Sequence, residues 1–340
     1  MRTATDPWSA SQVKAHQKKE NLDTSMSVTA TAIDERADGI TRVDLAELIA
    51  LRARAGKPGG ARTRARTPLA GGHVSVLRGR GMDYAESRIY QAGDDARNID
   101  WRRTARSGKW HTKLFEAERE RSLLVLIDTH ATMRFGTRVR YKSVAAARAA
   151  AWLAWTCVRG GDRVGALAFG AVRDAVDPHA GARGALNALG ALAHWDATAS
   201  AGSHVDEPLS AAIARAQRLI AAGNRIWLLS DGWCTDATAI AALARLNRHA
   251  EVRVVIVIDP LERELAPKGA YVFETAADRQ AIDLAGAEAR AGFRKQLAEG
   301  WHGLAKACDA AGVAWTTLST GDEPEVALAP FLRRRSARRE

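Results

Sequence analysis

Two strand-sized runs of Leu, Ile and Val constrain the fold of this chain most, because each of them leads into an aspartate. Residues 123–127 precede Asp128, and residues 226–229 with Ser230 precede Asp231. Apolar runs of this length are typical of strands that are buried on both faces of a parallel sheet. The carboxyl ends of such strands line the crevice where open α/β sheets bind ligands. We therefore expect both carboxylates at one edge of a sheet.

From residue 122 onward, strand patterns alternate with helical patterns. The expected strands are residues 122–128, 163–169, 225–230, 252–258 and 312–318, and the expected helices are residues 142–159, 182–194, 208–221, 235–249 and the helical stretch 277–311. This alternation indicates a parallel sheet with helices on both faces and with the first strand in the centre. The predicted fold class is α/β: a doubly wound, mainly parallel sheet over residues 122–320, with a small N-terminal β-rich subdomain.

The residues outside this sheet domain differ in composition. Residues 1–40 are polar and lack a periodic apolar face, and we expect them to be disordered. Residues 41–121 hold an N-terminal helix over residues 43–51, a basic linker over residues 56–68 and the β-rich subdomain. Residues 321–340 form a basic tail, and we expect its end, residues 333–339, to be solvated rather than in contact with an anionic surface.

The net charge of +11 raises the question of nucleic-acid binding. Residues 1–122 carry +7 of this charge, and the most basic run in them comprises Arg52, Arg54, Lys57, Arg62, Arg64 and Arg66. No aromatic side chain interleaves with this run, as a stacking platform for bases would require. We therefore expect a solvated linker or a contact to an acidic surface, and we do not expect nucleic acid as the main partner.

Apolar stretches and cysteines bear on the compartment. Residues 144–158 are interrupted by Arg148 and are too short to span a bilayer, and the N-terminus lacks the apolar core of a secretory signal. We therefore expect a cytoplasmic protein without a membrane span. Cys157, Cys234 and Cys308 are scattered without CxxC spacing, so we expect neither a disulfide framework nor a zinc site.

Hydroxyl side chains accompany the two strand-end acids. Thr132 follows Asp128 closely, and Ser203 lies in a loop before a helix. Mg²⁺ prefers oxygen ligands in octahedral geometry and retains several waters. Asp128, Thr132, Ser203 and Asp231 would supply such ligands. The alternative is that both acids only cap the following helices and accept backbone N–H bonds, and the spacing alone leaves both hypotheses open.

The segments Asp128-Thr129-His130-Ala131-Thr132, Gly202-Ser203 and Ser230-Asp231-Gly232 together resemble the von Willebrand factor A domain. This resemblance implies a metal-ion-dependent adhesion site in which Asp128 and Asp231 match the acids of that family, while Thr132 and Ser203 replace its hydroxyl ligands. His130 departs from the pattern, because it stands where the first serine ligand is expected. Imidazole is a poor ligand for Mg²⁺, so we expect a degenerate site that binds Mg²⁺ or Mn²⁺ weakly or not at all. We expect His130 to hydrogen-bond a neighbouring acid such as Asp231 instead.

A second block of sequence precedes the sheet domain. It contains Gly79-Arg80-Gly81-Met82-Asp83-Tyr84 and the core Gly93-Asp94-Asp95-Ala96-Arg97-Asn98-Ile99-Asp100-Trp101. This block resembles the signature of the domain of unknown function 58 family, bacterial proteins that join it to a von Willebrand-like sheet, and the resemblance covers residues 43–320. It implies association with a MoxR-type AAA+ ATPase. Many members carry N-terminal membrane spans, and this chain resembles the shorter, soluble type.

The same block alternates acids and bases around two apolar residues. Its expected charge network, with Trp101 at its centre, comprises Arg88, Asp94, Asp95, Arg97, Asp100 and Arg106. We expect Arg–Asp pairs to pin this subdomain to the sheet domain, and Asp94 or Asp95 to cap a short helix over residues 96–102. The alternative is that the arginines bind a phosphate or the carboxylates of a partner. Because acids and bases nearly balance, we favour the structural role.

These features favour non-enzymatic protein binding, as an adaptor for a MoxR-type AAA+ ATPase. The sequence contains no Gly-Lys-Ser/Thr phosphate loop, no Gly-x-Ser-x-Gly elbow and no His-Glu-x-x-His motif. Two alternatives remain open. The first is a metal-dependent phosphoester hydrolase that uses Asp128 and Asp231 with Asp94 or Asp95. The second is a nucleic-acid-binding module that uses the basic linker.

Overall fold

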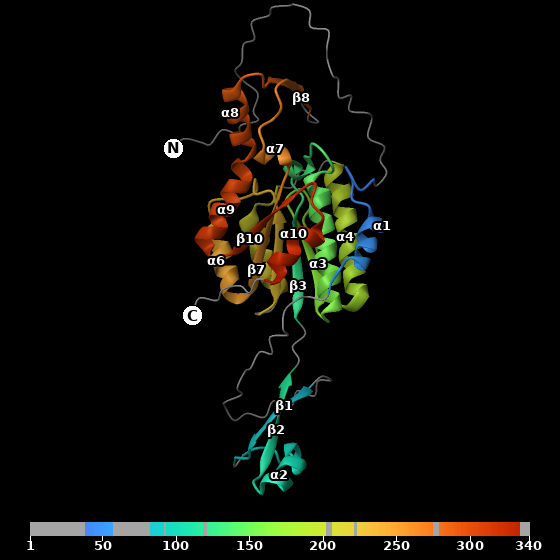
Figure 1. Cartoon of the computed structure of the whole chain (residues 1–340), viewed down its shortest axis with the longest axis vertical. Coiled ribbons are helices and arrows are strands. Elements are labelled where there is room, and N and C mark those ends of the chain that lie inside the picture. Colours follow the sequence, from blue (N-terminus) through green and yellow to red (C-terminus); the bar gives the residue numbers. More distant parts are fainter. Residues whose placement is uncertain are drawn as a thin grey trace, which may run out of the picture. The chain divides into compact units, whose positions relative to one another are not determined.

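The computed structural model describes residues 38–56, 82–91, 93–117, 121–201, 206–220, 223–274 and 279–333 (Figure 1). The predicted disordered N-terminus up to residue 37, the linker from residue 57 and the end of the basic tail from residue 334 lie outside the described residues. Among the described helices, none is both long enough and apolar enough to cross a membrane.

A six-stranded sheet forms the centre of the sheet domain, with the strand order β10-β7-β6-β3-β4-β5. Its strands are β3 (Ser122–Asp128), β4 (Arg163–Phe169), β5 (Asp174–Ala180), β6 (Arg225–Ser230), β7 (Glu251–Ile258) and β10 (Ala314–Ser319). Neighbouring strands are parallel except for β5, which runs antiparallel to β4. The predicted doubly wound, mainly parallel α/β sheet with a central first strand is confirmed. The sequence did not predict β5, whose mostly exposed polar residues and proline are tolerated only at a sheet edge.

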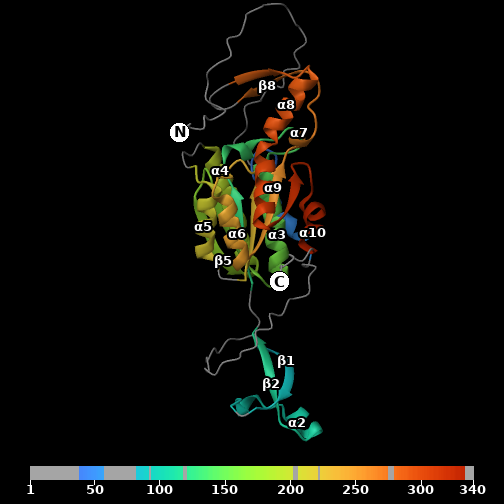
Figure 2. The ribbon, with the colours of Figure 1, turned by 90° about the vertical axis from the view of Figure 1, so that its left-hand side faces the viewer.

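Helices cover both faces of this sheet (Figure 2). On one face lie α1 (Leu45–Ala50), α3 (Lys142–Arg159), α4 (Gly181–Ser200) and α10 (Pro324–Arg333), and on the other lie α5 (Leu209–Leu219), α6 (Ala239–His249) and α9 (Glu299–Ala311). Successive side chains of a strand point to opposite faces. Accordingly, Leu123, Val125 and Ile127 of β3 belong to the first core, and Leu124 and Leu126 belong to the second.

Helix α3 occupies the middle of the first face, and nearly all of its side chains are buried. Its alanines, including residues 145–147 and 149–151, allow the helix backbone to lie close to the sheet. One buried cation interrupts them: Arg148 pairs with Glu47 of α1 and, at 2.6 Å, with Glu323 at the start of α10. Helix α3 therefore holds segments from both ends of the sequence.

Two members of the basic run, Arg52 and Arg54, have structural partners. Arg54 forms ion pairs with Glu323 at 2.8 Å and Glu325 at 3.3 Å. The guanidinium of Arg52, in the 3-10 helix η1 (Leu51–Ala53), lies 5.3 Å from the centre of the Trp155 ring. The start of the basic run therefore contacts other parts of the chain. Of the two roles predicted for this run, contact with acidic groups describes Arg54 better than a solvated linker does.

The β-rich subdomain contains the antiparallel strands β1 (Met82–Ile89) and β2 (His111–Ala117). Between them lie the 3-10 helix η2 (Ala96–Asn98) and the helix α2 (Trp101–Ser107). Asp95 accepts a hydrogen bond from the backbone N–H of Arg97, and Asp100 accepts one from Arg103, so each caps a helix start. Gly108 ends α2 with a φ of 68°, a left-handed conformation that favours glycine.

The contacts described for the predicted charge network lie within this subdomain. Arg88 pairs with Asp94 at 2.6 Å, and Asp100 accepts a hydrogen bond from the Ser87 hydroxyl at 2.6 Å. Arg97 and Arg106 are exposed. The expected helix over residues 96–102 is instead two short helices, because Asp95 and Asp100 each start one.

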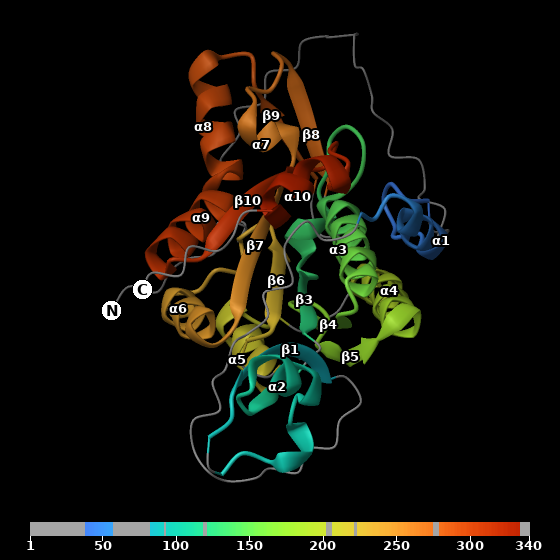
Figure 3. The same cartoon turned by 60° about the horizontal axis from the view of Figure 1, so that its bottom comes forward.

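Two segments after β7 differ from the expected pattern (Figure 3). Residues 277–311 do not form a continuous helical stretch: the hairpin of β8 (Ala270–Glu274) and β9 (Arg279–Asp283) precedes α8 (Ala287–Leu297) and α9. Pairing with β8 overrides the helical preference of the alanines in this segment. The predicted basic tail begins with α10, where Leu328 and Phe331 are buried in the first core. The basic composition of residues 333–339 concealed that apolar stripe.

Candidate functional site

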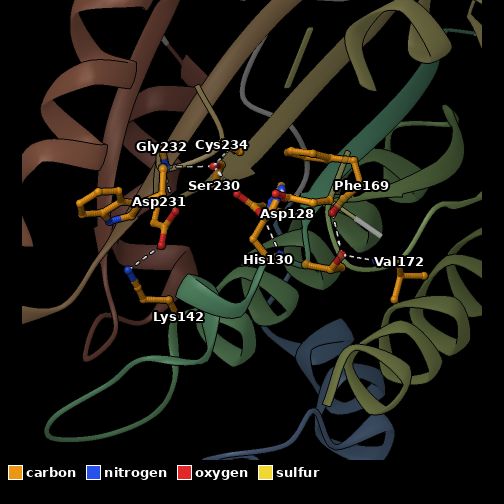
Figure 4. A network of polar contacts seen from close by, with 12 residues as sticks. Asp128, His130, Lys142, Phe169, Val172, Ser230, Asp231, Gly232 and Cys234 are labelled. Carbon is orange, nitrogen blue, oxygen red and sulfur yellow. Dashed lines mark hydrogen bonds and ion pairs between the residues drawn. The ribbon is translucent and has the colours of Figure 1, made fainter. Parts of the chain in front are cut away.

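The structure brings the two strand-end acids to the same edge of the sheet (Figure 4). Strands β3 and β6 pair in parallel with Ile127 opposite Leu229, so Asp128 and Asp231 follow at neighbouring carboxyl ends. Both aspartates are 1% exposed. Buried carboxylates require hydrogen-bond donors or cations close to them, and the partners of each acid therefore decide what this edge can do.

Asp128 accepts three hydrogen bonds, which engage both of its oxygens. The backbone N–H of His130 lies 2.9 Å and its Nδ1 lies 2.6 Å from Oδ1, and the Ser230 hydroxyl donates to Oδ2 at 2.6 Å. Burial alone would raise the pKa of Asp128. The hydrogen bond and charge of His130, together with Ser230, outweigh burial and lower the pKa of Asp128 below its ordinary value.

The imidazole of His130 lies between two carboxylates. Its Nε2 lies 2.8 Å from Asp206, whose side chain is 87% exposed, while Nδ1 faces Asp128. Burial would lower the pKa of His130, but the hydrogen bond and charge of Asp128, with the charge of Asp206, raise it. The prediction that His130 hydrogen-bonds a neighbouring acid is confirmed, but the acids are Asp128 and Asp206 and not Asp231, the example named. The turn after β3 folds the ring back onto Asp128, two residues earlier in the chain.

Close packing fixes the position of this ring. Gly170 follows β4 with a φ of 95°, and a Cβ added there would lie 2.5 Å from Nδ1 of His130. The ring of Phe169 also meets the imidazole edge-on, with the ring centres 5.9 Å apart. A larger residue at position 170 would therefore displace the imidazole from Asp128.

Asp231 has a cationic partner of its own, Lys142, the first residue of α3. The Lys142 Nζ donates to Asp231 at 2.7 Å and to Glu262 of α7 (Pro260–Arg263) at 2.9 Å, and all three side chains are at most 3% exposed. Burial would lower the pKa of Lys142, but the two acids raise it. Burial also raises the pKa of Glu262, and Lys142 only partly offsets this effect. Sequence reasoning missed Lys142. The signal was its place at a helix N-terminus, where the positive end of the helix dipole repels a cation, so that a lysine there needs an acidic partner.

A third strand-end acid, Asp259, follows β7 and was also missed. It accepts hydrogen bonds from the backbone N–H and hydroxyl of Thr137, at 3.0 and 2.5 Å, and from the hydroxyl of Thr320 at 3.0 Å. It also caps α7 through the N–H of Leu261. The sequence carried a signal, since Ile258-Asp259 repeats the pattern of an apolar strand ending in an acid. The contacts of Asp259 fix two loops and the start of α7 at this edge.

The two hydroxyls expected as metal ligands have different outcomes. Thr132 lies in the 3-10 helix η3 (Ala131–Arg134), and its buried Oγ1 has no hydrogen-bond partner among the described residues. Ser203 lies outside the described residues, within the segment 202–205. A hydroxyl that the sequence analysis did not select, that of Thr129, donates to the carbonyl of Phe169 at 2.6 Å and so links β3 to β4.

The described side chains do not fit a Mg²⁺ ion. Mg²⁺ requires oxygen ligands at about 2.1 Å in octahedral geometry. The side chains beside Asp128 that could act as further ligands are the imidazole of His130 and the thiol of Cys234, which Mg²⁺ does not favour. The ammonium group of Lys142 lies beside Asp231 and would repel a divalent cation. The two acids are instead neutralised by an imidazole and an ammonium group of the protein itself.

Comparison with protein families and curated sequences gives consistent results. The family model "Protein of unknown function DUF58" matches residues 86–302. The "Uncharacterized protein Mb1516" of Mycobacterium bovis and the "Uncharacterized protein Rv1480" of Mycobacterium tuberculosis are each 34% identical to this chain over 214 residues. These matches cover 61% of this chain and 65% of each relative, less than two thirds of the relatives' length.

Solved structures with similar folds share little sequence with the chain. The "conserved hypothetical protein BatB" of Bacteroides thetaiotaomicron is 15% identical, with a TM-score of 0.39 over 62% of this chain and 96% of that chain. The "von Willebrand factor type A" structure from Catenulispora acidiphila is 16% identical, with a TM-score of 0.36 over 67% of this chain and 44% of that chain.

Proposed function

We propose, from the premise that this chain belongs to the DUF58 family of proteins of unknown function, that it acts by binding another protein and not as an enzyme. The partner that we propose is a MoxR-type AAA+ ATPase in the cytoplasm, for which the chain serves as an adaptor. The observation that carries this proposal is a pair of exposed tryptophans, Trp101 and Trp110, in and beside the signature block of the family.

The two tryptophans form an aromatic cluster on the β-rich subdomain. Trp101 begins α2 and Trp110 precedes β2, and their side chains are 64% and 57% exposed. Their ring centres lie 6.2 Å apart, and Tyr90 lies 6.0 Å from Trp110. Tryptophan and tyrosine are enriched in protein interfaces and supply much of their binding energy. An exposed cluster of this kind is typical of a docking surface for another protein.

The charges around this cluster favour an acidic partner surface. Residues 101–115 contain five basic side chains and no acidic one: Arg102, Arg103, Arg106, Lys109 and Lys113. Complementary charges at the rim of an interface speed association and select partners, and salt weakens their effect. We therefore expect an interface in which the tryptophans are central and the basic residues face acids of the ATPase.

The sheet edge supports the non-enzymatic part of the proposal. Asp128 is buried, and its oxygens are engaged by His130 and Ser230. Asp231 is bound to Lys142. Hydrolysis of a phosphoester by two metal ions needs several carboxylates free to hold the ions. Asp231 is not free in that sense, because the ammonium group of Lys142 is bound to it.

Affinity purification from native lysate tests this function. The tagged chain should enrich an AAA+ ATPase, identified by mass spectrometry, and the variant with Trp101→Ala and Trp110→Ala should lose it. Each interface tryptophan typically contributes about 2 kcal/mol, or about 30-fold in affinity. The matched control is Val326→Ala, which removes an apolar side chain that is 74% exposed on α10. The control should retain the ATPase.

Three results would reject the proposal. The first is the absence of any AAA+ ATPase among the enriched proteins. The second is recovery of RNA alone with a steep loss in salt, which would favour the nucleic-acid-binding alternative. The third is hydrolysis of phosphodiesters with Mn²⁺ that disappears in Asp128→Ala, which would make the chain a hydrolase.

A further inference from the structure

Three potential ligands of a softer metal ion meet at the sheet edge. A carboxylate oxygen of Asp128, a ring nitrogen of His130 and the Sγ of Cys234 all lie within 4.8 Å of one another. Asp128 ends β3, and His130 and Cys234 lie in the loops that follow β3 and β6. Ser230 connects them: its hydroxyl donates to Asp128 at 2.6 Å and lies 3.2 Å from the Cys234 sulfur.

The groups behind these ligands are arranged as they are behind many protein-bound metals. A metal-binding histidine usually donates its other ring N–H to a carboxylate, which fixes the orientation of the ring. Asp206 is the carboxylate that takes this role for His130, since it lies 2.8 Å from Nε2. The other ring nitrogen, Nδ1, is directed toward Asp128. Ser230 holds the second oxygen of Asp128, and the backbone N–H of Gly232 donates to Ser230 at 2.9 Å.

The chemical types of the ligands select the metal. One thiol, one imidazole and one carboxylate are a ligand set that suits Zn²⁺ and that Mg²⁺ does not accept. In a tetrahedral zinc site these atoms would lie about 3.3–3.6 Å apart, given metal–ligand distances of about 2.0–2.3 Å. The 2.6 Å contact between Nδ1 of His130 and Asp128 would have to open by less than 1 Å, and a pair of ligand atoms at the 4.8 Å limit of the cluster would have to close by between about 1 and 1.5 Å.

We propose that Asp128, His130 and Cys234 bind a Zn²⁺ ion or a similar divalent transition metal. The side chain of His130 is 14% exposed whereas that of Asp128 is fully buried, so metal and solvent reach the site from the side of His130. Water completes the coordination. The proposal does not depend on the protein-binding function. The spacing of cysteines in the sequence could not indicate this site, because its ligands come from two loops that the pairing of β3 with β6 brings together.

Titration with Co²⁺, which reports on zinc sites through its spectrum, tests this proposal. The full chain is stripped with a chelator, desalted and titrated with Co²⁺ alone at pH 8. Tetrahedral Co²⁺ with one thiolate ligand should give visible d–d bands and a near-ultraviolet thiolate-to-cobalt band that saturate at one ion per chain. Added Zn²⁺ should abolish both, whereas Mg²⁺ should not.

Variants separate this site from other thiols. Cys234→Ser should lose the thiolate band, whereas Cys308→Ser should keep it, since Cys308 is also buried in the second core but lies outside the cluster. Asp206→Asn, at an exposed position, should retain the band at saturation but bind Co²⁺ about 10–100-fold more weakly. Circular dichroism of each metal-free variant verifies its fold. A wild-type protein without a thiolate band, or Cys234→Ser that keeps it, would overturn the proposal.

Discussion

Replacement of Lys142 by methionine should destabilise the fold strongly, because this ammonium group is the only one described between two buried acids. The variant keeps the length and apolar stem of the side chain but removes its charge. Asp231 and Glu262 then remain buried at the sheet edge without their cation, although they contact the same ammonium group at 2.7 and 2.9 Å in the native structure. We therefore expect Lys142→Met to lower the free energy of unfolding by more than the loss of an ion pair on the surface would.

The size of the effect follows from burial and distance. Removal of one partner of a buried ion pair typically costs about 3–5 kcal/mol. At an effective dielectric constant of 20, two carboxylates about 5 Å apart repel each other by about 3 kcal/mol. One of them can escape this repulsion by taking up a proton. For a carboxyl group with an ordinary pKa of 4.5, protonation at pH 7 costs about 3.4 kcal/mol. These terms agree on about 3–4 kcal/mol at pH 7.

The pH dependence gives the prediction a second signature. At pH 5.5 the cost of protonating one acid falls to about 1.4 kcal/mol. The destabilisation caused by Lys142→Met should therefore be about 2 kcal/mol smaller at pH 5.5 than at pH 7. In the wild type, the folded-state pKa of Lys142 is raised above 10.5. Its contribution is therefore complete at neutral pH and is lost only as the pH rises through that raised value.

Urea unfolding of both proteins, followed by circular dichroism at pH 7 and pH 5.5, measures these differences. The control is Arg138→Met. Arg138 pairs with Glu264 at 2.6 Å, but both side chains are 58% exposed, so its loss should cost no more than about 1 kcal/mol. The reasoning is refuted if Lys142→Met costs no more than this control, or if its cost does not decrease at the lower pH.

Three further predictions concern other parts of the molecule. The buried thiols of Cys157 and Cys308, whose pKa values burial raises to about 12, should not react with a thiol reagent such as DTNB until the protein is unfolded in urea. Burial would raise the pKa of Asp38, but hydrogen bonds from its neighbours lower this pKa to about 2. The stability that Asp38 contributes should therefore be lost between pH 4 and pH 2, and acid unfolding of Asp38→Ala should lack this loss. Gly232→Ala should lower the free energy of unfolding by at least about 2 kcal/mol. The added Cβ would lie 2.3 Å from the carbonyl oxygen of Gly300, and residue 232 has a φ of 89°. An unchanged midpoint of urea unfolding would contradict this prediction.

The central sheet could be predicted because its strands carry their signal locally. The run that ends in Asp128 is apolar throughout and fits a strand buried on both faces, and the same holds for the run before Asp231. The edge strand β5 carries no such signal, since only pairing with β4 makes it a strand. The hairpin of β8 and β9 likewise depends on contact between two segments.

The site was predictable in position but not in chemistry. Parallel pairing of neighbouring strands is enough to place Asp128 near Asp231. Apart from His130, the partners of these acids lie far away along the chain: Lys142 is 89 residues from Asp231, and Ser230 is 102 residues from Asp128. Nothing in the local sequence around Asp231 shows that Lys142 neutralises it. The same limit concealed the meeting of Cys234 with His130, because each residue taken alone has no metal-binding spacing.

The two buried cations of α3 have a consequence for the order of folding. Lys142 meets Asp231 and Glu262, which lie 89 and 120 residues later, and one partner of Arg148, Glu323, lies 175 residues later. A ribosome that has completed α3 has therefore not yet produced the acids that make its burial favourable, apart from Glu47. The ion pairs of Lys142 and the pair of Arg148 with Glu323 can form only after these later segments have been made. Assembly must then wait for nearly the whole domain and proceed through contacts of long sequence separation, which slow folding.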